Sequence, residues 1–350
     1  MTSRGWAAAG GTAALVGAGL LAAGRGVRSK YGHPPRRHTS GDPGRVPPSA
    51  LDIDIAGTGG ARLRGWLIES PSTHSGAAAL VVHGWGGSAI DMLPVSETLG
   101  ALGLHVLLLD ARGHGRSDDG SVASMPAFAE DVRAALGWMR SAPQVDPSRI
   151  VLVGHSVGAG ACLFVAAGDP EIAAVVSLAS MADPSSFMAQ RLRHRLPGPL
   201  TGLALRYVEH TIGHRFTEFA PVHTIGRVRA PVLLVHGLLD STVPVSDAYR
   251  LHAQAPERSA LVVVPDGDHF STHALDTAGP HLVRFLEKAR LIEPPAVKGT
   301  GRAEPATHCP APDGVPTWGD RSPYPGGYML RRRGTISVAQ SRRVARDRAT

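Results

Sequence analysis

Cysteine is scarce in this sequence of 350 residues, which contains only Cys162 and Cys309. Two cysteines are too few for the disulfide framework that holds together many small secreted domains. Cys162 lies in a run of small and apolar residues at positions 159–167, which is typical of a small residue in a hydrophobic core. The chain must therefore fold around an apolar core, and a hydrophobic content of 43% is sufficient for one.

The sequence also lacks the motifs by which many proteins bind phosphates, nucleotides and metal ions. It contains no G-x-x-x-x-G-K-[ST] loop and no G-x-G-x-x-G motif after a strand. Residues 154–160 are rich in glycine, but they include no lysine that could contact a phosphate. The 17 histidines include no pair at metal-ligand spacing inside a candidate site. We therefore expect neither a cofactor nor a metal ion.

Positive charge is distributed unevenly along the chain. The formal net charge is +7, yet residues 51–292 contain 19 lysines and arginines against 23 aspartates and glutamates. The two flanking segments contain the other 17 basic and 6 acidic residues. We therefore expect that the central region does not bind nucleic acid, whereas the basic flanks leave contact with an anionic membrane or a nucleic acid open.

An uncharged stretch near the N-terminus, residues 5–24, is long enough to span a bilayer as a helix. Its alanine and glycine content makes insertion only marginally favourable. We expect a membrane anchor, with a cleaved signal peptide and a disordered start as alternatives. Basic residues gather after the stretch, so the body of an anchored protein should face the cytoplasm. A secreted protein and a soluble cytoplasmic protein are the alternatives for its location.

Composition divides the chain into three parts. Residues 1–50 combine the uncharged stretch with a linker rich in proline, glycine, arginine and histidine. Residues 51–292 have the apolar periodicity of one folded domain. Residues 293–350 are rich in proline, glycine and arginine without any period, which predicts a disordered basic tail.

The central part alternates apolar strands with helices. Residues 51–55 and 63–68 alternate apolar and polar residues on either side of a glycine-rich turn, which predicts an antiparallel hairpin. Further apolar runs predict strands at residues 77–82, 104–109, 149–153, 173–178, 232–236 and 261–264. With helices between them, these runs predict an α/β fold with a mostly parallel, doubly wound sheet. Residues 183–228 interrupt the alternation, and we expect an inserted helical cap there.

The pentapeptide GHSVG at residues 154–158 lies between a predicted strand and a predicted helix. In that setting G-x-S-x-G forms a nucleophile elbow, in which glycines allow strand and helix to approach closely around an exposed serine hydroxyl. A serine hydroxyl is a weak nucleophile at neutral pH, so Ser156 needs a nearby base and an acid that orients the base.

Two residues that follow later strands can supply these groups. Asp240 comes after the strand at 232–236, and His269 comes after the strand at 261–264. The order serine, aspartate, histidine is the one expected for this elbow type. Asp266 and Asp268 compete for the acid role, but they share a short loop with His269 and are poorly aimed at its far nitrogen. Asp240 could instead cap the helix that follows it.

Five segments together resemble α/β-hydrolases, in the broad group of esterases, thioesterases, lipases and serine-aminopeptidase-like enzymes. They are HGWGGS at residues 83–88, DARGHGRS at 110–117, the GHSVG elbow, the Asp240 loop and His269. The resemblance covers roughly residues 53–289 and implies the fold of that family. It also implies an oxyanion hole formed by the backbone N–H groups of Trp85 and Val157, and loop-bracing roles for His83 and His114.

These features predict a serine hydrolase that cleaves carboxylic esters of small acyl substrates through an acyl-enzyme. Cleavage of peptide or aminoacyl bonds, and acyl transfer or perhydrolysis on the same residues, are alternatives. A catalytically silent binding protein is the alternative from another class. Because a cap would shape the acyl pocket, we expect Phe187, Leu192 and Leu196 to set the preference for chain length.

Overall fold

The computed structural model describes residues 32, 34, 36, 46–70, 76–120, 122–270 and 278–293. These residues belong to a single unit, Met1–Pro295. The uncharged stretch at residues 5–24 and the basic tail from residue 294 lie outside the described residues. Within the described ranges, no helix has the length and apolar character needed to cross a membrane. The N-terminal anchor therefore stays a prediction.

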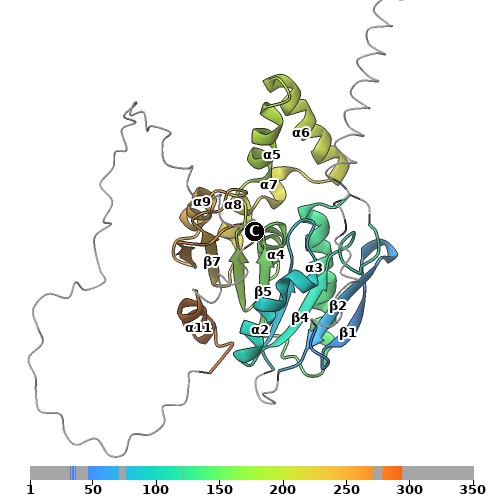
Figure 1. Cartoon of the computed structure of the whole chain (residues 1–350), viewed down its shortest axis with the longest axis vertical. Coiled ribbons are helices and arrows are strands. Elements are labelled where there is room, and N and C mark those ends of the chain that lie inside the picture. The colour runs from blue at the N-terminus through green and yellow to red at the C-terminus, as the bar shows by residue number, and fades with distance from the viewer. Residues whose placement is uncertain are drawn as a thin grey trace, which may run out of the picture. The chain divides into compact units, whose positions relative to one another are not determined.

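The described residues form a sheet of eight strands in the order β1-β2-β4-β3-β5-β6-β7-β8 (Figure 1). The strands are β1 (Leu51–Ala56), β2 (Arg62–Ile68), β3 (Ala78–Val82), β4 (His105–Asp110), β5 (Ile150–His155), β6 (Ala174–Leu178), β7 (Val232–Gly237) and β8 (Ser259–Val264). β2 pairs antiparallel with β1 and with β4, whereas the six strands β3 to β8 are parallel to one another. The predicted hairpin and mostly parallel sheet are confirmed.

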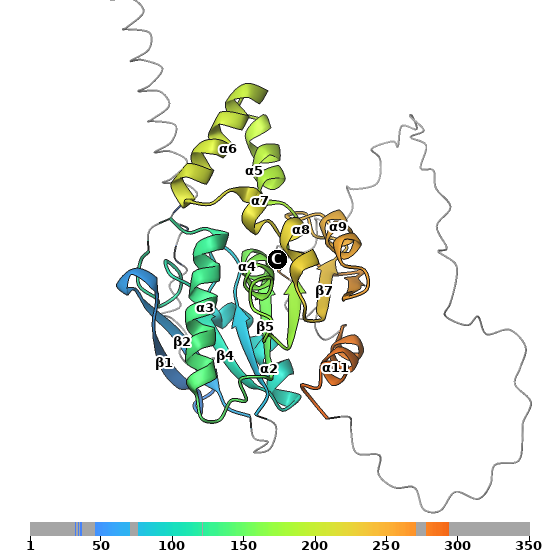
Figure 2. The same cartoon turned by 180° about the vertical axis from the view of Figure 1, so that it is seen from behind.

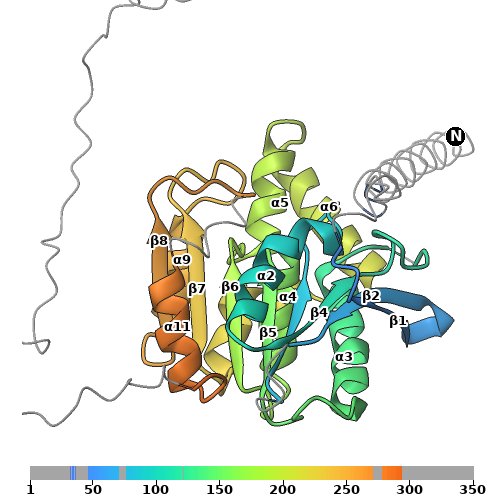
Figure 3. The same ribbon diagram turned by 60° about the horizontal axis from the view of Figure 1, so that its bottom comes forward.

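Helices cover both faces of this sheet because the strands are apolar on both sides. They are α2 (Leu93–Ala101), α3 (Met125–Ser141), α4 (Val157–Ala166), α9 (Ser246–Gln254) and α11 (Gly279–Lys288). Successive residues of a strand point to opposite faces, so Leu80 and Leu152 join the core that contains α3 and α4. Val81 and Val153 join the second core, with α2 and α11. Figure 2 shows α3 across the first face, and Figure 3 shows α2 and α11 across the other.

Between β6 and β7 the chain forms α5 (Pro184–Arg193), α6 (Gly198–Ile212), α7 (Phe216–Phe219) and α8 (Pro221–Thr224). The helices α5 and α6 stand beyond the carboxyl ends of the strands (Figure 1). They contribute only Pro184 and Thr201 to the buried residues, whereas Phe216, Phe219 and Ile225 are buried in the main core. The cap proper is therefore limited to α5 and α6, which is narrower than the 183–228 expected.

The strand order reverses at β3, which lies between β4 and β5. The connections that leave β3 and β5 therefore run to opposite sides of the sheet and open a crevice at their carboxyl ends. The HGWGGS loop follows β3, and the GHSVG elbow follows β5. The topology thus brings these two motifs together at the position where ligands bind in open α/β sheets.

Candidate active site

Ser156 lies on the sharp turn between β5 and α4, with φ 54° and ψ −114°. A positive φ is strained for a residue with a side chain and persists only where the surroundings enforce it. A Cβ atom at Gly154 would lie 2.5 Å from the carbonyl oxygen of Gly158, and one at Gly158 would lie 2.4 Å from the carbonyl oxygen of His83. Both positions therefore require glycine, as the elbow motif predicts.

Ser156, His269 and Asp240 form one continuous chain of hydrogen bonds. The distance from Nε2 of His269 to Oγ of Ser156 is 3.1 Å. Nδ1 of His269 lies 2.7 Å from Oδ2 of Asp240. Since an ionised carboxylate only accepts, Nδ1 carries the proton and leaves Nε2 to accept from the serine hydroxyl. The structure thus brings together three side chains that the sequence places after β5, β7 and β8.

The surroundings of Asp240 keep its carboxylate ionised. Its Oδ1 accepts the N–H groups of Thr242 and Val243 at 2.8 Å each. Burial alone would raise the pKa of Asp240, but hydrogen bonds from His236, His269 and the Val243 N–H outweigh it. The pKa of Asp240 is therefore held well below its usual range.

The two other candidates for the acid that orients His269, Asp266 and Asp268, lie on the protein surface. Asp266 and Asp268 are both exposed, and Oδ1 of Asp268 accepts the N–H of Phe270 at 2.9 Å. Asp240, by contrast, is 7% exposed and directly contacts the imidazole. Of the three candidate acids, Asp240 is therefore the one that is placed to orient His269.

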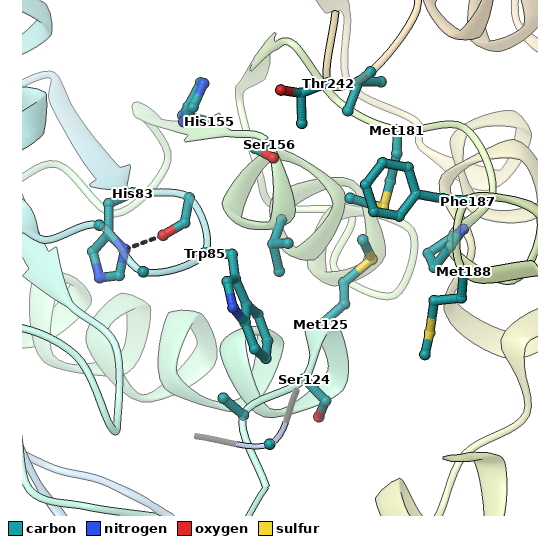
Figure 4. A pocket seen from close by; sticks show the side chains of 18 of the residues that line it. His83, Trp85, Ser124, Met125, His155, Ser156, Met181, Phe187, Met188 and Thr242 are labelled. Carbon is teal, nitrogen blue, oxygen red and sulfur yellow. Dashed lines mark hydrogen bonds between the residues drawn. The ribbon is translucent and has the colours of Figure 1, made fainter. Parts of the chain in front are cut away.

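The two predicted oxyanion donors flank Ser156. Val157 is the first residue of α4, where no preceding helical turn offers its N–H a carbonyl. Trp85 lies in the loop after β3, and the glycine before it passes so close to the elbow that a Cβ at Gly84 would lie 3.1 Å from Cβ of Ser156. Trp85, Ser156 and Val157 line the same cavity, and Figure 4 shows the indole of Trp85 beside it.

His83 braces the loop that carries Trp85. Its Nδ1 donates to the carbonyl of Gly84 at 2.7 Å (Figure 4), and its Nε2 accepts the N–H of Ala111 at 3.1 Å. Burial lowers the pKa of His83 to about 4, so the ring is neutral at pH 7 and can donate with Nδ1 while it accepts with Nε2. This is the role that the family resemblance implied for His83.

Two further histidines, His155 and His236, support the site through backbone carbonyls; the sequence places His155 near the nucleophile and indicates nothing for His236. Nε2 of His155 donates to the carbonyl of His269 at 2.6 Å, and burial lowers the pKa of His155 to about 4. Nε2 of His236 donates to the carbonyl of Val243 at 2.9 Å and lies 3.3 Å from Oδ2 of Asp240. Their position as the last or next-to-last residue of a buried strand, β5 or β7, is the available signal.

The serine opens into a cavity of about 820 Å³, large enough for a substantial organic ligand. Trp85, Met125, Met181, Phe187 and Met188 give it largely apolar walls (Figure 4). The cap contributes Pro184, Phe187, Met188, Arg191, Leu192, Ala204, Tyr207, Val208, Thr211 and Ile212.

Of the three cap residues expected to set chain length, Phe187 and Leu192 line this cavity. Leu196 is not among the lining residues, so that expectation is wrong for Leu196. It follows the end of α5, where its N–H donates to the carbonyl of Leu192.

Within the described part of the chain, no group of three histidine, cysteine or acidic residues is arranged to hold a metal ion.

The sequence is also similar to a known protein family and to curated proteins. The family described as serine aminopeptidase, S33, matches residues 73–212. The uncharacterised protein Rv2307c of Mycobacterium tuberculosis is 33% identical over 232 residues, which cover 66% of this chain and 76% of that protein.

Solved structures of esterases share the fold. The Pyrococcus furiosus esterase Pf2001 superposes with a TM-score of 0.58 at 22% identity, covering 74% of this chain and 98% of that one. Est1E from Butyrivibrio proteoclasticus, solved with ferulic acid bound, gives a TM-score of 0.55 at 22% identity and covers 69% and 99%. The sheet order, the elbow after β5 and these matches together establish that the chain belongs to the α/β-hydrolase superfamily.

Proposed function

We propose that this protein is a serine hydrolase that cleaves carboxylic esters through an acyl-enzyme intermediate. The observation that carries the proposal is the hydrogen-bonded chain from Asp240 through His269 to Ser156, which ends at a large apolar cavity. A hydroxyl, a neutral imidazole and a buried carboxylate in this order are the groups that acyl transfer requires.

In the first half of the reaction, Oγ of Ser156 attacks the ester carbonyl while Nε2 of His269 takes the hydroxyl proton. Asp240 stabilises the imidazolium that forms and holds the ring with Nδ1 toward the carboxylate. The negative charge on the carbonyl oxygen is stabilised by the N–H groups of Trp85 and Val157. Each such donor is worth on the order of 10²–10³ in rate.

The leaving alcohol takes the proton from Nε2 of His269, and the acyl group stays on Ser156. Water then attacks the acyl-enzyme and gives its proton to the same nitrogen. Collapse of the second tetrahedral intermediate releases the acid and returns the proton to Oγ. His155 contributes by holding the backbone of His269, because its Nε2 donates to that carbonyl.

A panel of p-nitrophenyl esters of increasing chain length tests the proposal. The wild-type protein should hydrolyse them, and Ser156→Ala should lower kcat by on the order of 10⁶-fold. Ser186→Ala is the matched control, because Ser186 is an exposed serine on α5 that does not line the cavity. Equal hydrolysis by Ser156→Ala and wild type would contradict the proposal.

Amide cleavage is the second candidate, favoured by the match to the serine aminopeptidase family. The same three residues would attack an aminoacyl bond, with His269 protonating the leaving amine. A panel of aminoacyl anilides measured beside the esters separates the two activities. We expect the esters to be the better substrates.

We also propose that residues 5–24 anchor the protein with its catalytic body on the cytoplasmic side. The support is the uncharged stretch followed by Arg25, Arg28 and Lys30. Membrane fractionation followed by protease treatment of intact cells tests this. Full-length protein in the membrane pellet, protected from protease, is the expected result, and a shortened exported protein that begins near Arg25 would contradict it.

A further inference from the structure

We propose that Arg191 of the cap recognises an anionic group on the substrate, so that the cavity accepts acyl chains that are neutral or end in a carboxylate and rejects chains that carry an ammonium group. This inference rests on the proposed ester hydrolysis. It concerns the charge of the substrate, which neither the sheet nor the hydrogen-bonded chain of Ser156 determines.

Arg191 lies at the cavity wall as an exposed side chain that has no carboxylate partner among the described residues. It lines the cavity one helical turn after Phe187, and its guanidinium carbon lies 4.0 Å from the centroid of the Phe187 ring. A cation over an aromatic face is stabilised there while its N–H groups remain available to a ligand. No salt bridge joins Arg191 to a carboxylate among the residues that the structure describes.

The second arginine of the cavity differs in this respect. Nη2 of Arg36 lies 2.6 Å from Oδ1 of Asp119, and Nη1 donates to the carbonyl of Gly115 at 3.1 Å. The charge of Arg36 is therefore balanced by the protein. This contrast leaves Arg191 as the cation of the described cavity wall that a substrate anion can neutralise.

Acidic groups are nearly absent from the same wall. Among the described lining residues the carboxylate is Asp91, and its Oδ2 accepts the N–H of Ser88 at 2.9 Å and its hydroxyl at 3.4 Å. These bonds close a capping box at the start of the 3₁₀ helix Ala89–Met92, away from the cap. A substrate ammonium group near Arg191 would thus meet a like charge, with no carboxylate of the cap beside it among the described residues, and like charges repel.

The walls between Ser156 and the cap fit a flexible chain. Met125, Met181 and Met188 lie along this side of the cavity, with Phe187 beside them (Figure 4). Methionine side chains adapt to ligands of varied shape. An ester carbonyl at Ser156 and an anionic group at Arg191 would both contact the wall of this one cavity. The substrate class that fits is an ester of an acyl chain with a distal anionic group.

Three p-nitrophenyl esters of matched length test this charge preference: one with a terminal methyl group, one with a terminal carboxylate and one with a terminal ammonium group. The full-length wild-type protein should give a kcat/KM for the carboxylate ester at least about tenfold above that for the ammonium ester, the size expected for one charged hydrogen bond. Arg191→Glu should reverse this ratio, because the charge that faces the distal group of the substrate changes sign.

Arg193→Glu is the matched control, because Arg193 is an exposed arginine on the same helix that does not line the cavity. It should keep the wild-type ratio. An unchanged ratio in Arg191→Glu, with all three esters still hydrolysed, would overturn this inference alone. Preference for the ammonium ester that disappears in Asp91→Asn would overturn it as well. Failure of the wild-type protein on every ester would overturn the proposed function together with this inference.

Discussion

The sheet body and the cap are built in opposite ways. In the body, Ser156, Asp240 and His269 are 5%, 7% and 7% exposed, and buried hydrogen bonds hold each of them. In the cap, α5 and α6 contribute only Pro184 and Thr201 to the buried residues. Regions with few buried apolar contacts open more easily than a core. The body therefore holds the candidate catalytic residues in fixed positions, whereas the cap can adapt to a ligand in the cavity.

Each region is stabilised by different interactions. The loops of the body are tied to one another by buried polar groups, such as Asp110, whose Oδ1 accepts the N–H of Ala89 at 2.7 Å. The cap begins at an Asp183 side chain that accepts the N–H of Ser185, and α6 ends at Gly213 with φ 74°. Substitutions in the body should therefore change turnover or stability, and substitutions in the cap should change selectivity.

After the loss expected for Ser156→Ala, the largest effect should come from Asp240→Asn. An amide in place of the carboxylate no longer fixes the tautomer of His269, and kcat should fall by on the order of 10⁴-fold. Steady-state kinetics on a p-nitrophenyl ester measure this loss. Asp268→Asn is the matched control and should be nearly silent, because Asp268 is exposed and contacts the N–H of Phe270. Equal losses in the two variants would show that the acid has been assigned to the wrong residue.

The second effect concerns the pH dependence of stability. The pKa of His83 is lowered by burial from 6.5 to about 4, so the unfolded chain binds this proton more readily than the folded protein. Its contribution to stability is therefore complete above about pH 6.5 and is lost as the pH falls toward 4. At pH 5 the loss should be about 2 kcal/mol for this residue.

Urea unfolding at pH 7.5 and pH 5.0 measures this loss of stability. His83→Gln should reduce the fall in the free energy of unfolding between the two pH values by about 2 kcal/mol, whatever its effect at pH 7.5. His223→Gln, at an exposed histidine of α8, should keep the wild-type fall. An identical fall in wild type and His83→Gln would contradict this assignment of the pH dependence.

The smallest effect should lie in the cap. Phe187 lines the cavity and is half-buried, so Phe187→Ala should shift the ratio of kcat/KM between long-chain and short-chain esters by about tenfold with little change in the unfolding midpoint. Leu196→Ala is the matched control, since Leu196 is half-buried but does not line the cavity. Equal shifts in both variants would indicate that the cap acts through its overall stability.

Much of the body could be predicted from the sequence, because its signals are local. Alternation of apolar residues around glycines predicts the hairpin of β1 and β2, and continuous apolar runs predict the buried strands. The glycines at 154 and 158 are needed for one sharp turn, so the elbow is visible in five consecutive letters. Ser156, Asp240 and His269 could be identified in this order because each of them follows the carboxyl end of a predicted strand.

The remaining features depend on contacts between distant residues. His155 and His236 support the site through the carbonyls of His269 and Val243. Because every residue has a backbone carbonyl, residue types do not reveal which carbonyl a histidine contacts. The sequence predicts a cap that extends beyond α6, because Phe216 and Phe219 also lie in helical segments, yet these two side chains pack into the core. The ion pair of Arg36 with Asp119, and the lack of such a pair for Arg191 within the described part of the chain, likewise depend on tertiary structure.

The central claim is that Ser156 is the nucleophile. Incubation of the full-length protein with a fluorophosphonate, followed by mass spectrometry of the digested protein, tests it most directly. The account predicts a single stoichiometric adduct on the peptide that contains Ser156, with parallel loss of esterase activity, and no adduct in Ser156→Ala. Labelling of a different serine, or esterase activity that survives full labelling of Ser156, would contradict the account.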